Sequence, residues 1–264
     1  MELIGTGGTA EVFIQDSGHV LKLFREWFSE PGIRSEYRKT QWANRQGIPS
    51  ARTIGLIEAE GRRGMLLERI EGETLLAKLH REPESVDDAA AEFAGMQVRL
   101  HSREARSLDD SQRQRLVQRI PQAPGLDEDE KSAVLAQLER LPDGDRLCHG
   151  DYHPGNIIVP AGGGEWRIID WIDSNCGHPL YDAARTLLLI GFGTEAGGPR
   201  EAMQDAAVRF RESYLRTYTE LSGFSIEEVE RWLLPVAAAR LPEPIPETEK
   251  TLLRKLVKER LALL

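Results

Sequence analysis

The sequence predicts an α+β fold in two lobes, a small strand-rich N-terminal lobe and a larger, mainly helical C-terminal lobe. The chain has 264 residues, which is long for one ordinary domain and comfortable for two lobes that share a cleft. Its first 70 residues alternate short apolar runs with turn residues, whereas helical periodicity prevails after Glu71-Gly72. We therefore expect an N-lobe over residues 1–70 and a C-lobe over residues 71–264.

The N-lobe is expected to be a small antiparallel β-sheet with one helix. Turn residues such as Ser17-Gly18 separate the apolar runs and favour hairpins. A helix is predicted over residues 33–45, because Gly47-Ile48-Pro49 ends the helical pattern. The expected strands lie at residues 3–4, 10–15, 19–24, 53–58 and 64–70.

The C-lobe is expected to be helical apart from short strands that flank the segment between residues 147 and 170. The polar run over residues 102–122 is predicted to be a solvated helix or loop. After residue 170 the chain is expected to be mainly helical. The remaining expected helices cover residues 73–81, 87–101 and 127–140.

Composition and charge exclude several classes of protein. With 29% charged and 40% hydrophobic residues the chain fits a globular protein and not a disordered or fibrous one. It carries 34 basic and 43 acidic residues, and a formal charge of −9 disfavours nucleic-acid or anionic-membrane partners. We therefore expect neither partner.

The sequence also favours a cytoplasmic location. Cys148 and Cys176 are its only cysteines, which suits a reducing compartment. Residues 1–6 lack the basic start and apolar core of a signal peptide. The longest apolar stretch, residues 183–192, contains Arg185 and is about half the length that spans a bilayer.

The most informative stretch runs from His149-Gly150-Asp151 to Asn156, and Asp170-Trp171 follows it. Pro154-Gly155 lies between Asp151 and Asn156, so the turn can bring both polar side chains to one side. The apolar runs after Asn156 and before Asp170 predict a hairpin that returns Asp170 to Asn156. Two carboxylates and an amide around one point form a hard-oxygen site for Mg²⁺ that also holds substrate phosphates.

These residues resemble the aminoglycoside phosphotransferase and choline kinase family, whose fold is that of protein kinases. The matching pattern is H-G-D-x-x-x-x-N followed by two hydrophobic residues and D-W. The resemblance implies that Asp151 is the catalytic residue that orients the attacking hydroxyl or accepts its proton. It further implies that Asn156 and Asp170 hold the metal ions and that His149 braces the loop.

One alternative interpretation of the same stretch is a metallophosphoesterase, because Asp151-Tyr152-His153 also matches an Asp-x-His metal pair. Such enzymes need a second cluster of Asn and His ligands further along the chain. Only His178 follows, without a neighbouring Gly-Asn-His. The sequence therefore favours the phosphotransferase.

The N-lobe supplies three further candidates in the order that the family requires. Gly5, Gly7 and Gly8 lie in a Gly-rich loop whose N–H groups can approach phosphates closely. Lys22 lies in the middle of an apolar strand, where an ammonium must be paired or bound to an anion. Its expected partner is Glu36 on the following helix, with Glu30 as the alternative.

By resemblance, the strand that ends near residue 70 is the family's hinge. The backbone between Leu67 and Ile70 would then meet the adenine edge, which makes Glu68 and Ile70 candidate nucleotide contacts. Together with the Gly-rich loop, Lys22 and Glu36, these residues form the expected ATP site. The expected cofactors are ATP and Mg²⁺.

Departures from the protein-kinase pattern favour a small-molecule acceptor. Gly150 replaces the usual arginine, Trp171-Ile172 replaces Phe-Gly, and no Ala-Pro-Glu segment follows. By the same resemblance Asp182 braces the catalytic loop, and Asp173 is a candidate acceptor contact.

The sequence thus predicts an ATP-dependent kinase that transfers the γ-phosphoryl group to a hydroxyl of a small molecule. The acidic balance favours a cationic acceptor. An aminoglycoside, choline, an amino alcohol or a sugar all fit, and neither the acceptor nor the oligomeric state follows from the sequence. The alternative of a different class is a non-catalytic nucleotide-binding module, which would have no need of Asp151.

Overall fold

The computed structural model describes residues 1–108, 110–195 and 201–264. The chain forms two compact units. The strand-rich unit comprises residues 1–78 and 154–173, and the helical unit comprises residues 79–153 and 174–264. This division falls within helix α2 (Leu75–Arg81) and also assigns residues 154–173 to the strand-rich unit. The lobe boundary expected at residue 70 stays a prediction.

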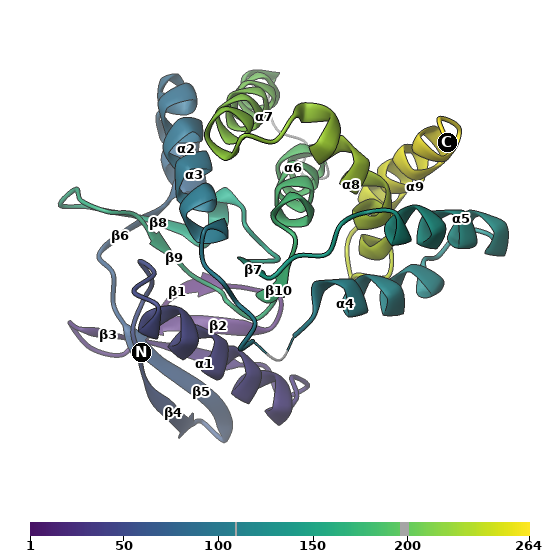
Figure 1. Cartoon of the computed structure of the whole chain (residues 1–264). Helices are drawn as coiled ribbons and strands as arrows, with labels where there is room; N and C mark the ends of the chain where they lie inside the picture. The colour runs from purple at the N-terminus through teal and green to yellow at the C-terminus, as the bar shows by residue number, and fades with distance from the viewer. Residues whose placement is uncertain (109, 196–200) are drawn as a thin grey trace. The chain divides into compact units, whose positions relative to one another are not determined.

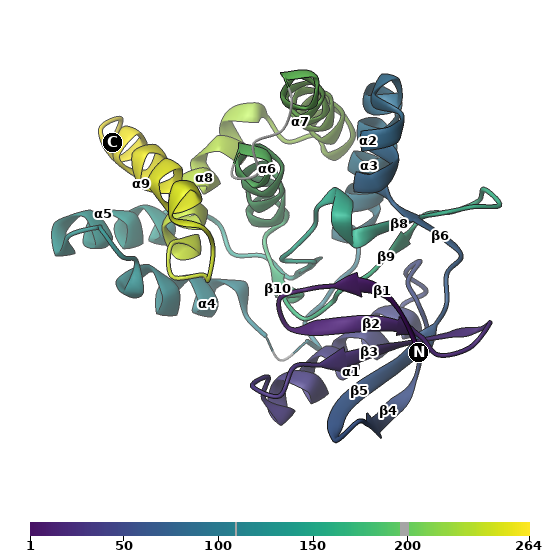
Figure 2. The same ribbon diagram turned by 180° about the vertical axis from the view of Figure 1, so that it is seen from behind.

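The strand-rich unit contains a five-stranded antiparallel sheet in the order β1-β2-β3-β5-β4 (Figures 1 and 2). Each pair of consecutive strands from β1 to β3, and the pair β4–β5, is joined by a short turn, as the turn residues predict. The strands are β1 (Glu2–Thr6), β2 (Ala10–Ile14), β3 (His19–Phe24), β4 (Thr53–Ala59) and β5 (Arg62–Glu68).

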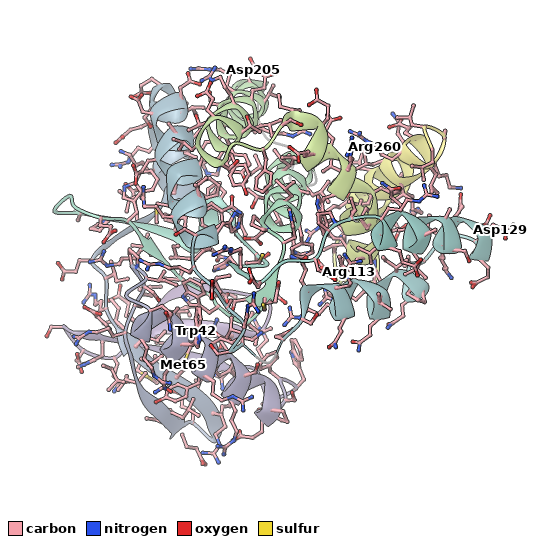
Figure 3. The ribbon with its side chains drawn as sticks, in the orientation of Figure 1. Trp42, Met65, Arg113, Asp129, Asp205 and Arg260 are labelled. Atoms are coloured by element: carbon pink, nitrogen blue, oxygen red, sulfur yellow. The ribbon has the colours of Figure 1, made fainter. Side chains whose placement is uncertain are left out.

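Helix α1 (Glu30–Arg45) covers one face of this sheet (Figure 1). Its N-cap is Ser29, whose side chain accepts a hydrogen bond from the N–H of Gly32. Ile33 on the helix packs with Phe24 on β3 and Met65 on β5, all at most 3% exposed (Met65 is labelled in Figure 3). This core fixes the helix against the strand that carries Lys22.

A second sheet in the strand-rich unit has the order β6-β8-β9. Its strands are β6 (Gly72–Thr74), β8 (Ile157–Pro160) and β9 (Arg167–Ile168). Strands β8 and β9 pair in antiparallel fashion, so the hairpin predicted between Asn156 and Asp170 is confirmed. The helix expected from residue 73 starts only at Leu75, because residues 72–74 instead pair with β8.

The helical unit is built from long helices and one small strand pair, β7 (Arg146–Cys148) with β10 (Asn175–Gly177). Helix α4 lies within the polar run 102–122, and Arg113 ties it to the end of α5 by donating to the carbonyls of Leu138 and Leu141 (Figure 3). The helices are α3 (Val86–His101), α4 (Gln112–Arg119), α5 (Glu128–Glu139), α6 (Pro179–Glu195), α7 (Glu201–Ser222), α8 (Ile226–Arg240) and α9 (Glu247–Leu261). Short 3₁₀ turns cover Pro83–Ser85, Ile120–Gln122 and Pro154–Asn156.

Side-chain caps fix the starts of several of these helices. Asp127 and Ser225 each form a reciprocal capping box, with Glu130 at the start of α5 and Glu228 at the start of α8. Within the described part of the chain, no helix combines the length and the apolar character that crossing a membrane requires.

Candidate active site

The Gly-rich segment forms the turn between β1 and β2. The N–H of Gly7 donates to the carbonyl of Ala10 (2.8 Å), and the side chain of Arg25 donates to the carbonyls of Gly7 and Gly8 (both 3.1 Å). None of Gly5, Gly7 and Gly8 has a positive φ, and a Cβ atom added at Gly8 would meet no atom within 4 Å. The local backbone therefore does not itself require glycine here, and the open space above the turn suits a ligand that approaches the main chain closely.

Lys22 lies in β3 with its ammonium between two carboxylates. Its Nζ is 2.5 Å from Glu36 Oε1 and 3.1 Å from Asp170 Oδ1. Burial lowers the pKa of Lys22, but the charges of Asp170 and Glu36 outweigh it and raise that pKa above its ordinary value. Lys22 is thus held as a cation. Glu36, and not Glu30, is its partner: Glu30 pairs with Arg34 and Arg63 at the surface.

Glu36 is buried, with 1% of its surface exposed, and its second oxygen, Oε2, has no hydrogen-bond partner among the described residues. Burial raises the pKa of Glu36 to about 7, because the charge of Lys22 only partly offsets burial and the charge of Asp170 adds to it. One ammonium therefore serves two carboxylates. A further cation beside Asp170 would relieve this excess of negative charge.

Asn156 directly precedes β8 and Asp170 follows β9, so both lie at the open end of the β8–β9 hairpin. The N–H of Ile169 donates to the carbonyl of Asn156 at 3.0 Å, which holds the two ends together. Asp170 itself has φ 65°, an uncommon left-handed conformation for a residue other than glycine. A buried amide and a carboxylate therefore leave the same end of one hairpin.

This donor set fits Mg²⁺ bound together with phosphates. Mg²⁺ keeps several waters and uses one or two carboxylates plus substrate oxygens, so it needs no all-protein cage. Correspondingly, no cluster of three or more His, Cys, Asp or Glu residues that could hold a metal occurs in the ranges 1–108, 110–195 and 201–264.

Of the two hinge candidates, Glu68 ends β5 and Ile70 lies two residues beyond it, so the strand expected over residues 64–70 ends earlier than predicted. The backbone N–H groups of Glu68 and Arg69 donate to the carbonyls of Arg52 and Gly18, both at 2.8 Å. These bonds fix the course of the chain on both sides of Glu68. The role of Glu68 and Ile70 in contacting a nucleotide stays a prediction.

Asp151 belongs to the helical unit, in the loop that follows β7. Gly150 before it has φ 78°, a conformation that a side chain would strain. The N–H of Asp151 donates to Nδ1 of His149 (3.3 Å), so His149 braces the loop as expected. The side chain of the following Tyr152 is fully buried, and its hydroxyl donates to the carbonyl of Phe93 on α3.

Asp182 on α6 holds the backbone of the same loop. Its two carboxylate oxygens accept hydrogen bonds from the N–H of His149 (2.9 Å) and the N–H of Gly150 (2.7 Å). Burial raises the pKa of Asp182, but the hydrogen bond and charge of His101, with smaller contributions from the charge of His149 and the N–H of Gly150, lower it overall, so the carboxylate is ionised. The prediction that Asp182 braces the loop is confirmed.

The carboxylate of Asp151 has a cationic or polar neighbour on each side. His153 Nε2 is 3.5 Å from its Oδ2, and Arg185 Nη2 on α6 is 3.9 Å from its Oδ1. Burial raises the pKa of Asp151, but His153 and Arg185 outweigh it, so that pKa lies below its ordinary value. Asp151 is ionised at neutral pH.

The structure thus brings Lys22, Glu36, Asp170 and the backbone of Asn156 together in the strand-rich unit. The convergence of Asp151 with Asn156 and Asp170 stays a prediction. Two residues that sequence reasoning missed are Arg185 and Lys39, whose Nζ donates to the carbonyl of Ile172 (2.8 Å). Arg185 could have been found, since a charged residue within an apolar helix must be paired.

Comparison with known proteins adds a family to this geometry. The sequence model of the phosphotransferase enzyme family, APH, matches residues 2–232. No curated protein matches the chain.

Solved structures similar to the chain include two aminoglycoside phosphotransferases and an ethanolamine kinase. An aminoglycoside-3'-phosphotransferase of type VIII has 20% identity and a TM-score of 0.62, over 90% of this chain and 93% of that chain. A thermostable mutant of APH(4)-Ia, in a ternary complex with AMP-PNP and hygromycin B, has 16% identity and a TM-score of 0.64, over 98% and 92%. An ethanolamine kinase from Plasmodium vivax has 14% identity and a TM-score of 0.63, over 97% and 81%. The predicted two-lobed, protein-kinase-like α+β fold is confirmed by these likenesses.

Proposed function

Because the chain belongs to the phosphotransferase enzyme family, we propose that it transfers the γ-phosphoryl group of ATP to a hydroxyl group of a small molecule. Family and fold support a small-molecule phosphotransferase. Our proposal adds ATP as the phosphoryl donor and a hydroxyl group as the acceptor. The observation that carries the proposal is the ammonium of Lys22 held between Glu36 and Asp170. Phosphoryl transfer depends on positioning and charge neutralisation, and this triad is suited to both.

Each residue then has a role that follows from its chemistry. Lys22 would bind the phosphates of ATP, and the open turn at Gly7 and Gly8 would let backbone N–H groups approach them. Asn156 and Asp170 would hold Mg²⁺, which neutralises charge on the transferred group. The APH(4)-Ia complex with AMP-PNP supports a nucleotide in this fold.

Asp151 would accept a hydrogen bond from the acceptor hydroxyl and take its proton late. Its lowered pKa makes it a weak base that is always ionised at neutral pH, which suits orientation more than early proton abstraction. A loose transition state demands little base strength. A non-catalytic nucleotide-binding module would have no use for this arrangement.

We further propose an acceptor that carries both an amine and a hydroxyl. The formal charge of −9 favours a cation near the protein. Neighbours named for aminoglycosides and ethanolamine act on molecules of this kind.

The test is transfer of labelled phosphate from ATP to a panel of aminoglycosides, choline, amino alcohols and sugars. In Asp151→Asn we expect kcat to fall by about a hundredfold to ten-thousandfold, because the hydroxyl loses its acceptor. Nucleotide affinity, measured by calorimetry, should stay within about twofold, because Asp151 makes no contact with ATP in this proposal. The matched control is Asp129→Asn, the same change at an exposed position of α5 (Figure 3). Full activity in Asp151→Asn, or no transfer by the native chain to any acceptor of the panel, would contradict the proposal.

A further inference from the structure

Arg185 lies on helix α6, one turn after Asp182, and contacts the loop that contains Asp151. It is buried, with 5% of its surface exposed. Its Nε donates to the carbonyl of Gly150, and its Nη2 lies 3.9 Å from Asp151 Oδ1. That distance is too long for a hydrogen bond but short enough for strong electrostatic attraction.

Glu243 holds the other side of this guanidinium. It lies in the Pro-rich turn between α8 and α9, and its two oxygens are 2.8 Å from Arg185 Nη1 and 3.3 Å from Nη2. Arg240 at the end of α8 and Arg119 at the end of α4 also donate to Glu243, at 2.6 and 2.9 Å. Glu243 therefore links helices α4, α6 and α8.

With Asp151 included, the described side chains of this cluster carry equal numbers of basic and acidic groups. Arg240 donates to Glu243 and also to Glu249 on α9. Its Nε and Nη2 are 2.9 and 2.7 Å from Oε1 of Glu249. Three arginines thus face two glutamates, and the third negative charge near them is Asp151. Buried ions are stable only when paired, so Arg185 is drawn toward both carboxylates.

We propose that Arg185 is a positioning residue for Asp151, and that Glu243 keeps Arg185 from hydrogen-bonding directly to its carboxylate. The proposal rests on the role of Asp151 in phosphoryl transfer argued above. The guanidinium of Arg185 donates through Nε to Gly150 and through its two Nη atoms to Glu243. The single ammonium of lysine cannot reproduce this geometry. The carboxylate of Asp151 is oriented by a nearby charge, and its oxygens are not captured by that charge.

Loss of Glu243 should therefore affect the reaction through Arg185. In Glu243→Gln the guanidinium loses its main counter-charge and moves onto Asp151 as a bidentate partner. The captured carboxylate no longer accepts a hydrogen bond from the acceptor hydroxyl. In Arg185→Met the carboxylate instead loses its orientation.

The experiment is a double-mutant cycle with Arg185→Met, Glu243→Gln and the double variant, scored by kcat and by calorimetric nucleotide affinity. Each single change should lower kcat about tenfold to a hundredfold with nucleotide affinity unchanged, as expected for a misplaced reacting group. In the Arg185→Met background, Glu243→Gln should have no further effect on kcat. If Arg185→Met does not fold, Arg185→Gln, which also removes the charge, replaces it in the same cycle, and kcat should fall similarly.

The matched control is Arg254→Met, which removes a positive charge from an ion pair with Glu247 on α9, outside this cluster, and should leave kcat within about twofold. Unchanged kcat in folded Glu243→Gln, or additive effects in the cycle, would overturn the inference. Asp151→Asn, measured in parallel, distinguishes a failure of the role of Arg185 from a failure of the proposed function. If Asp151→Asn is inactive while the cycle shows no effect, only the role of Arg185 is wrong, whereas an active Asp151→Asn contradicts the proposed function itself.

Discussion

A single ammonium that serves two carboxylates explains much of the chemistry of the strand-rich unit. The ammonium of Lys22 donates to Glu36 on α1 and to Asp170 after β9. Glu36 Oε2 has no hydrogen-bond partner among the described residues. Such a site is stable but short of positive charge. In the proposed function a metal ion beside Asp170 would supply the missing positive charge, and Lys22 would bind the phosphates.

Glu36 should matter for nucleotide binding although it touches no nucleotide. In Glu36→Gln the ammonium of Lys22 loses one of its two counter-charges, so Asp170 alone holds it away from the phosphates. We expect the affinity for ATP to fall about tenfold, which is the size of one hydrogen bond to a charged group. Calorimetry with Mg²⁺ present measures it.

The matched control is Glu30→Gln on the same helix, since Glu30 pairs only with surface arginines among its described ion-pair contacts. That variant should bind ATP as the native chain does. Equal affinities for all three proteins would rule out a positioning role for Glu36.

At the scale of an element, the segment after β9 is held in a strained conformation by bonds from distant residues. The left-handed backbone of Asp170 costs about 1–3 kcal/mol. Lys39 on α1 donates to the carbonyl of Ile172 (2.8 Å), and the indole N–H of Trp171 donates to Ser50 Oγ (3.0 Å). These two hydrogen bonds fix the chain immediately after Asp170.

Lys39→Met should release this anchor and weaken metal-dependent nucleotide binding. Asp170 would then relax from its left-handed conformation, and the affinity for ATP with Mg²⁺ should fall about tenfold, consistent with the loss of a charged hydrogen bond. The affinity without Mg²⁺ should change little. Arg38→Met, which removes a positive charge from an exposed position of the same helix, is the control. Parallel losses with and without Mg²⁺ would point to a general defect and contradict the argument.

Helix α6, which carries Asp182 and Arg185, begins with a titratable cap. The N–H of Leu180 donates to Nδ1 of His178 (3.2 Å), and the His178 ring stacks on Trp232. Burial, and next the charge of His101, lower the pKa of His178 below its ordinary value. Between the two pKa values the unfolded chain binds more protons than the folded chain, so this group destabilises the fold as the pH falls below about 6.5.

His178→Asn should flatten this pH dependence, because asparagine retains a cap acceptor and does not titrate. The urea midpoint, measured from pH 7.5 to 5.0, should fall less in the variant than in the native chain. His178→Ala should cost about 1 kcal/mol of stability at pH 7.5 through loss of the cap. An equally steep fall in His178→Asn would show that other groups cause the acid sensitivity.

Local sequence patterns predicted most helices and strands, but not the contacts between residues far apart in the sequence. Turn residues and alternation were sufficient for the strands of the first sheet and for the β8–β9 hairpin. The resemblance to the family also indicated Asp182 as the brace of the loop. Lys39 and Ile172, by contrast, are 133 residues apart, and nothing local to either selects the other. The sequence alone could not choose between Glu30 and Glu36, because that choice depends on how α1 packs on β3.

For the whole molecule, the two compact units divide the candidate residues between them. The strand-rich unit carries the Gly-rich turn, Lys22, Glu36 and the two candidate metal ligands, and the helical unit carries Asp151 with its supports from α6. The chain crosses from one unit to the other between His153 and Pro154, inside the motif that joins Asp151 to Asn156. If the proposed function is correct, mutations should therefore separate nucleotide binding from acceptor activation.

This division predicts how ligands change the stability of the chain. A ligand at 100 times its Kd that binds only the folded state stabilises it by about 2.7 kcal/mol, or roughly 5–10 °C in Tm for a chain of this size. We expect AMP-PNP with Mg²⁺ to produce such a rise in the native chain and in Asp151→Asn. In Asp170→Ala the part of the rise that depends on Mg²⁺ should disappear, because the carboxylate that would hold the ion is gone. Differential scanning fluorimetry with and without Mg²⁺ measures it, and Asp129→Ala is the exposed control. A full Mg²⁺-dependent rise in Asp170→Ala would remove Asp170 from the metal site, and a loss of the rise in Asp151→Asn would show that the two functions are not separable.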